Sequence, residues 1–145
     1  MKKYYPEFLV FFQLLFILLI LISAPIFNSL NLWLLLEISG IVLVFWAIYE
    51  IKLGNVNIRP IVKDGGVLII SGPYKLIRHP MYTATLMVMI ALIGEYYTHV
   101  RLAYFMALII VLLIKIQYEE KALINHFPAY VDYIKKSKRL IPYIY

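Results

Sequence analysis

The feature that most constrains this chain is a run without a single charged residue, from Phe8 to Ala24. Leu, Ile, Phe and Val dominate the run, which is just long enough for a helix to cross ~30 Å of hydrocarbon. A second apolar run extends from about Leu32 to Tyr49, after a stretch that Pro25 and Asn28 interrupt. The two runs predict an antiparallel pair of membrane-spanning helices joined by a short uncharged turn.

Two further helices are predicted in the second half of the chain. Proline is favoured at the first helical position, so we expect a third helix from Pro80 to about Tyr96 and a fourth from about Arg101 to Asn125. Their uncharged cores are shorter than the ~17 residues usually needed to span, so snorkelling basic residues or local bilayer thinning must help. The predicted fold class is all-α: a multi-pass transmembrane bundle of about four helices forming a single domain over residues 1–145.

Composition supports the membrane assignment and removes several kinds of chemistry. Hydrophobic residues make up 63% of the 145 residues and charged residues 15%, which is more apolar than a water-facing surface tolerates. The chain has no cysteine, so disulfides, thiolate catalysis and cysteine-based metal sites are excluded. The three histidines, His79, His99 and His126, lack metal-ligand spacing, and we predict no metal site.

The distribution of basic residues predicts the topology. Of the fourteen Lys and Arg residues, only Arg101 falls in an outer turn. The positive-inside rule therefore places both termini in the cytoplasm. It also accounts for the net charge of +6 without nucleic acid as a partner. The basic, aromatic tail from Phe127 should lie along lipid headgroups, as a C-terminal interfacial segment. On this topology the polar clusters 75–82 and 115–121 share the cytoplasmic face and can meet there.

The densest polar cluster, residues 72–82, reads GPYKLIRHPMY. If Pro80 is the first helical residue, His79 lies near the N-cap, and the free backbone N–H groups and the positive end of the helix dipole face the loop. With Arg78 beside them, they form a predicted site for a carboxylate or a phosphate. The alternative is that Arg78 and His79 only anchor the helix to headgroups.

The second cluster is the acidic pair Glu119 and Glu120, near the cytoplasmic end of the fourth helix. Adjacent residues on a helix point about 100° apart. We therefore expect at most one carboxylate to face the bundle interior, while the other meets water or Lys115 at i, i+4. The inward carboxylate would hold the hydroxyl or ammonium groups of a ligand. The alternative is a solvated helix end with an ordinary ion pair.

Together the two clusters offer groups with different chemical preferences. Arginine and a helix N-terminus suit an anionic group, a carboxylate suits an amine or a ribose diol, and tyrosine or histidine suits an aromatic or sulfonium group. S-adenosylmethionine presents all of these groups.

The order of these residues resembles a known family. The Gly-Pro-Tyr and Arg-His-Pro-x-Tyr sequences between residues 68 and 83 resemble the motif of the isoprenylcysteine carboxyl methyltransferase and phospholipid methyltransferase family. The later residues that follow in the family's order are Glu119, Glu120, Leu123, Phe127, Tyr130, Tyr133 and Pro142. The resemblance covers about residues 55–145, which we expect to form the cofactor-binding region.

The resemblance implies an integral membrane enzyme that transfers a methyl group from S-adenosylmethionine to a lipophilic acceptor. The acceptor classes it allows are an isoprenylcysteine-type carboxylate, a phospholipid amine and a small lipophilic compound. The cofactor-binding residues predicted on this basis are Tyr74, His79, Pro80, Tyr82, Glu119 and Glu120. The predicted catalytic residues are Arg78, His79 and Glu120, and the predicted substrate-binding residues are Arg78 and Tyr130.

Two positions depart from the family pattern, and two other functions remain open. Ala84 stands where many members have glycine, and we expect it to narrow the approach of the cofactor to the helix. Pro128 stands where many have glycine after the phenylalanine. One alternative is an NADPH-dependent membrane reductase of the sterol type, whose similar Arg-His-x-Asn-Tyr sequence has asparagine where this chain has Met81. The other is a non-enzymatic membrane protein that binds lipids or a partner.

Overall fold

The computed structural model describes residues 5–24, 30–51 and 67–145. Its elements are α1 (Tyr5–Ser23), α2 (Leu32–Ile51), the short 3₁₀ helix η1 (Gly72–Lys75), α3 (Pro80–Glu95), α4 (His99–His126) and α5 (Tyr130–Lys136). In these described ranges there is no β-strand, and the backbone pairing between extended segments is one isolated parallel bridge. The predicted all-α fold is confirmed.

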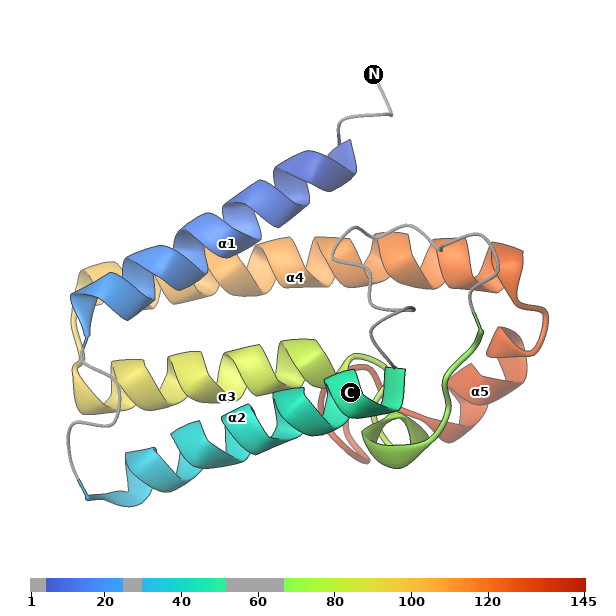
Figure 1. Ribbon diagram of the computed structural model, residues 1–145. Coiled ribbons are helices and arrows are strands. Elements are labelled where there is room, and N and C mark those ends of the chain that lie inside the picture. Colours follow the sequence, from blue (N-terminus) through green and yellow to red (C-terminus); the bar gives the residue numbers. More distant parts are fainter. Residues whose placement is uncertain (1–4, 25–29, 52–66) are drawn as a thin grey trace.

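The helices form two antiparallel pairs, α1 with α4 and α2 with α3, arranged as two layers (Figure 1). Contacts far apart along α1 fix its direction: Arg101 Nε donates to Ser23 Oγ at 2.9 Å, and Lys115 Nζ donates to Gln13 Oε1 at 2.8 Å. We call the end where α3 gives way to α4 the turn end, and the opposite end the α5 end. The start of α1, the end of α2, the start of α3 and the end of α4 all lie at the α5 end.

Apolar side chains join the two layers in the half of the bundle near the turn end. The buried members of this core come from α3, α4 and the end of α1; they are Ile20, Ala24, Met89, Leu92, Ile93, Leu108 and Leu112. No charged residue belongs to this cluster. The α5 end is held together differently, by the polar contacts described below.

The α2 and α3 helices approach closely at Gly40. A Cβ atom at this position would lie 2.9 Å from the carbonyl oxygen of Ala84 and 2.8 Å from Val88 Cγ2. Ala84 is buried on the face of α3 that packs against α2. Tyr82 precedes it by two residues and therefore points about 200° away around the helix, toward α4. The expectation that Ala84 narrows a cofactor site was therefore wrong, because its side chain faces the neighbouring helix.

The lengths of the helices match an integral membrane protein. α1, α2 and α4 are long and apolar enough to cross a bilayer, whereas α3 is shorter, with 16 residues. The third helix begins at Pro80 as predicted, and the fourth begins at His99, two residues earlier than predicted. Thr98 caps α4, since its side chain accepts a hydrogen bond from the Arg101 backbone N–H at 3.1 Å. Many large apolar side chains face outward, as lipid contact requires.

Most of the predicted loop after Glu50, residues 52–66, lies outside the described residues. The chain is described again from Val67, where residues 67–70 have no regular structure. The side chains of Val67 and Ile70 are exposed. The loop then enters η1, which leads to α3.

Candidate functional site

The loop before α3 is fastened to the end of α2. Gly72 has φ +54°, a left-handed conformation that glycine adopts at little cost. The loop approaches α2 closely here, since a Cβ atom at Gly72 would lie 2.5 Å from the Glu50 side chain. The Ser71 hydroxyl donates a hydrogen bond to the Glu50 carboxylate. These contacts fix where η1, and therefore the start of α3, lies.

The C-terminal tail pairs with the same loop. The backbone N–H of Arg78 donates to the Lys138 carbonyl at 2.7 Å, and the Lys138 N–H donates to the Leu76 carbonyl at 2.9 Å. The His79 N–H donates to the Arg139 carbonyl at 3.1 Å. The tail was expected to lie along headgroups, but this part of it is built into the protein, although the side chain of Lys138 stays exposed.

Most of the backbone N–H donors at the N-terminus of α3 already have partners within the protein. His79 is the N-cap and donates to the tail, Pro80 has no N–H group, and the Tyr82 N–H donates to the His79 carbonyl at 3.1 Å. The sequence predicted an anion site here because the first turn of a helix has unbonded N–H groups. That prediction was wrong in its premise, since the protein's own carbonyls take most of these donors.

Glu120 is the centre of a buried charge cluster. Its Oε1 accepts from Arg78 Nε at 2.8 Å, and its Oε2 accepts from Arg139 Nε at 2.9 Å. Arg78 also donates to the carbonyls of Ser137 and Ile134. Only 7% of the side chain of either Arg78 or Glu120 is exposed. The carboxylate therefore joins the loop, the tail and α4, and its lone pairs are largely occupied.

His79 lies between the two adjacent carboxylates. Its Nδ1 is 3.4 Å from Glu119 Oε2, and its Nε2 is 3.6 Å from Glu120 Oε1. The expectation that at most one of the two acids faces the bundle interior was wrong, because both lie beside His79. The imidazole has a nitrogen on each side, so it meets both flexible side chains despite the ~100° between them. Burial lowers the pKa of His79, but hydrogen bonds and charge from the two glutamates outweigh burial, and the pKa is raised overall.

Tyr82 connects His79 with the accessible carboxylate. Its ring stacks on that of His79, with centroids 5.6 Å apart and planes 6° from parallel. Its hydroxyl donates to Glu119 Oε1. The Lys115 Nζ lies over the Tyr82 ring, 5.1 Å from its centroid. Glu119 has 16% of its side chain exposed, against 7% for Glu120, so it is the more accessible of the two acids.

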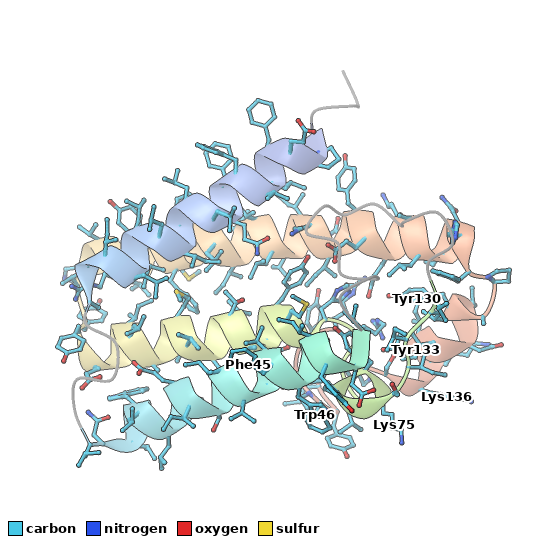
Figure 2. All side chains as sticks on the ribbon, in the orientation of Figure 1. Phe45, Trp46, Lys75, Tyr130, Tyr133 and Lys136 are labelled. Carbon is cyan, nitrogen blue, oxygen red and sulfur yellow. The ribbon has the colours of Figure 1, made fainter. Side chains whose placement is uncertain are left out.

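The tyrosines of α5 close the site from the tail side (Figure 2). Tyr133 Oη donates to the Tyr74 carbonyl, and the rings of Tyr130 and Tyr133 meet edge to face with centroids 5.5 Å apart. Burial raises the pKa of Tyr74 and of Tyr130, and it raises the pKa of Tyr133 to about 12. All three hydroxyls therefore stay protonated at neutral pH and can donate hydrogen bonds.

The buried Tyr130 hydroxyl has no hydrogen-bond partner among the described residues, whereas His79 Nε2 lies 3.6 Å from Glu120 Oε1, an ion-pair distance longer than that of a hydrogen bond. Buried polar groups in proteins are nearly always hydrogen-bonded, so the Tyr130 hydroxyl is a candidate ligand contact. Together with the Glu119 carboxylate it would suit a polar molecule with amine or hydroxyl groups, such as S-adenosylmethionine. Among the residues that the structure describes, no group of three or more potential metal ligands occurs.

The structure brings most of the predicted site residues together. Direct contacts join Arg78, His79, Tyr82, Glu119 and Glu120. Pro80 is buried at the first position of α3. Tyr130 is close enough to Glu120 and Arg78 for its pKa to respond to their charges, and Tyr74 to Glu119.

Three polar residues at the site were missed by sequence reasoning: Arg139, Lys115 as a partner of Tyr82, and Gln13. Gln13 carried a readable signal, because it is the one polar residue between Phe8 and Ile22 and polar residues inside a membrane helix usually contact a partner. Arg139 carried none, since it is one of several basic residues in the tail.

Comparison with known families supplies the class of protein. The profile of the isoprenylcysteine carboxyl methyltransferase family matches residues 31–125, well over half of the chain. The match begins just before α2 and ends near the end of α4, so it contains the contacts between Arg78, His79 and the two glutamates but not α1, α5 or the tail. A search of curated proteins gave no significant match. The chain therefore belongs to the isoprenylcysteine carboxyl methyltransferase family and is an integral membrane methyltransferase.

Proposed function

We propose that the protein transfers a methyl group from S-adenosylmethionine to a lipophilic acceptor at the cytoplasmic membrane interface. The observation that carries this proposal is the convergence of His79, Tyr82 and Glu119, near the buried Tyr130 hydroxyl, which has no hydrogen-bond partner among the described residues. Membership of the family supplies the reaction class, and these residues supply a place for the donor.

S-adenosylmethionine supplies an activated methyl group on a sulfonium centre. The residues that would hold it are His79, Tyr82, Glu119 and Tyr130, with Tyr74 and Pro80 supporting them. Glu119 is the accessible carboxylate and would accept hydrogen bonds from an amine or from hydroxyl groups. The Tyr130 hydroxyl would complete the set of polar contacts.

Arg78 and Glu120 have a different role in this proposal. Their polar atoms are taken up by each other, by Arg139 and by carbonyls of the tail. This placement favours a positioning function over the catalytic and substrate-binding functions expected from the sequence. By fixing the loop and the tail, the pair holds His79 and Tyr130 in place.

The acceptor decides whether a base is needed. A carboxylate is already nucleophilic at neutral pH, whereas an amine must first lose a proton. His79 is the group suited to take that proton, because the neighbouring glutamates stabilise its protonated form and raise its pKa. Beyond this, catalysis needs mainly that donor and acceptor are held within reacting distance.

The place of the site within the bundle suits a lipid-borne acceptor. The site lies at the α5 end, where α1, α2 and α4 emerge from the predicted spans. The positive-inside rule assigns that end to the cytoplasm. The methyl donor would then reach the site from the cytoplasm and the lipophilic acceptor from the bilayer, and the two would meet at the membrane interface.

Equilibrium binding of S-adenosylhomocysteine to the purified protein tests the proposal. We expect wild type to bind, His79→Ala to bind at least about tenfold more weakly, and Phe45→Ala, which removes an exposed lipid-facing side chain, to bind as wild type does. Absence of binding by wild type, or equal binding by His79→Ala, would contradict the assigned pocket.

A thermal-shift comparison with NADPH addresses the reductase alternative. Stabilisation by NADPH and not by S-adenosylhomocysteine would favour a reductase. Incubating membranes with S-adenosylmethionine labelled in its methyl group, and identifying the labelled lipid or protein, would then establish the acceptor class.

A further inference from the structure

Gln13 is an unusual residue for its position in α1. It is the one polar residue between Phe8 and Ile22, and a side-chain amide within a membrane helix is costly unless it is hydrogen-bonded. Its Oε1 accepts a hydrogen bond from Lys115 Nζ of α4 at 2.8 Å. The contact crosses from a helix outside the family-matched region to one inside it.

Lys115 is itself placed unusually for a lysine. Only 1% of it is exposed, and lysine is rarely buried to this degree without partners. Besides its bond to Gln13, its Nζ lies 5.1 Å from the centroid of the Tyr82 ring. A single amine thus links α1, α4 and α3 at the α5 end of the bundle.

The contact between Lys115 and Tyr82 matters because Tyr82 touches two residues of the candidate site. Its hydroxyl donates to Glu119, and its ring stacks on His79. Lys115 precedes Glu119 by one helical turn, the spacing at which lysine and glutamate side chains ordinarily meet. Gln13 offers Lys115 a different acceptor, on α1. The Glu119 carboxylate is thereby left to Tyr82 and His79.

We propose that Gln13 is a positioning residue for the methyl-donor site: it holds Lys115 against the Tyr82 ring and away from Glu119, so that Glu119 stays available to the donor. The inference rests on the proposed function, since it assigns Glu119 and Tyr82 to the donor pocket. It makes α1 a working part of the enzyme in addition to a membrane anchor. When Gln13 is removed, Lys115 turns to Glu119 and displaces the Tyr82 hydroxyl.

A double-mutant cycle on S-adenosylhomocysteine affinity tests this mechanism. Gln13→Leu is expected to weaken binding about tenfold in the wild-type background but less than about twofold in a Lys115→Met background, because no amine is then left to capture Glu119. Gln13→Glu keeps an acceptor for Lys115 and should bind within about twofold of wild type. Leu14→Ala, at an exposed neighbouring position, is the matched control. Melting temperatures of all variants report whether each is folded.

The outcomes separate the two proposals. Equal losses from Gln13→Leu with and without Lys115 would overturn the inference, as would a loss in Gln13→Glu equal to that in Gln13→Leu. Normal binding by Gln13→Leu would also overturn it while leaving the donor pocket intact. Failure of wild type to bind S-adenosylhomocysteine would overturn both the pocket and this inference.

Discussion

The two ends of the bundle are built on different principles. Near the turn end, the layers meet through apolar side chains such as Ile20, Leu92 and Leu108. At the α5 end they meet through buried charges and hydrogen bonds around Glu120, His79 and Lys115. In a bilayer, an apolar helix surface packs almost as favourably against lipid as against another helix, so shape alone decides between them. A buried polar group can be satisfied by few partners, and it therefore selects one arrangement of the helices. The contrast indicates that the turn end anchors the protein and the α5 end specifies a single arrangement of the site.

A second contrast lies within the α5 end, between neighbouring acids. Glu120 pairs with two arginines, whereas Glu119 accepts a hydrogen bond from Tyr82, lies 3.4 Å from His79 Nδ1 and is more exposed. Glu120 therefore supports the structure, and Glu119 is available for a ligand. Each prediction below is designed to break or sharpen one of these two contrasts.

The largest effect is expected from Glu120→Ala. The change leaves Arg78 and Arg139 without their shared carboxylate, and breaking a buried ion pair typically costs about 3–5 kcal/mol. We expect a strongly lowered melting temperature in detergent, with the loop and tail losing protection from hydrogen exchange. A melting temperature equal to that of wild type would remove the distinction between the two acids.

Leu108→Ala should also lower stability, by about 2 kcal/mol, because it leaves a cavity in the buried core near the turn end. Affinity for S-adenosylhomocysteine should stay within about twofold of wild type, since Leu108 lies about two helical turns before Lys115. Melting temperature and equilibrium binding together check this. A loss of binding as large as that from a site variant would show that the two ends are not separable.

Glu119→Gln is expected to weaken ligand binding while leaving the stability of the fold nearly unchanged. The amide keeps an acceptor for the Tyr82 hydroxyl but lacks the charge that favours an ammonium group, so affinity should fall about tenfold. Stability should change by less than about 1 kcal/mol, because this acid is partly exposed. Equilibrium binding and melting curves for Glu119→Gln and Glu120→Gln, measured side by side, would show whether the roles divide as proposed.

The smallest predicted effect concerns pH. The two glutamates raise the pKa of His79 above its unfolded value, so the folded protein holds this proton more tightly. The resulting stabilisation is fully present below about pH 6.5 and is lost as the pH rises through the folded pKa. Melting temperatures of wild type should therefore fall between about pH 6 and about pH 9 more steeply than those of His79→Gln. Parallel curves would contradict the placement of His79 between two carboxylates.

Much of the fold could be predicted because its causes are local. A charge-free run predicted α1, an apolar run predicted α2, and Pro80 fixed the start of α3. The meeting of the polar clusters 75–82 and 115–121 followed from their shared membrane face, without knowledge of side-chain positions. The match to the family, over residues 31–125, agrees with the resemblance read from the motif.

The errors arose where tertiary contacts decide. Helical spacing placed Glu119 and Glu120 on different faces, but it could not show that one imidazole would lie between them. Spacing also paired Lys115 with Glu119, whereas α1 supplies Gln13 as the acceptor. Nothing in the sequence of the tail distinguished Arg139, which binds Glu120, from its exposed lysine neighbours.

The length of α3 bears on the depth of the candidate site in the bilayer. Sixteen residues rise about 24 Å, less than the ~30 Å of hydrocarbon in a typical bilayer. α4, with 28 residues, runs on past the start of α3. If the turn end lies at the opposite membrane surface, the start of α3 and His79 would lie below the headgroups. A lipid anchored in the same leaflet would then present its reactive group to the site without being lifted out of the membrane.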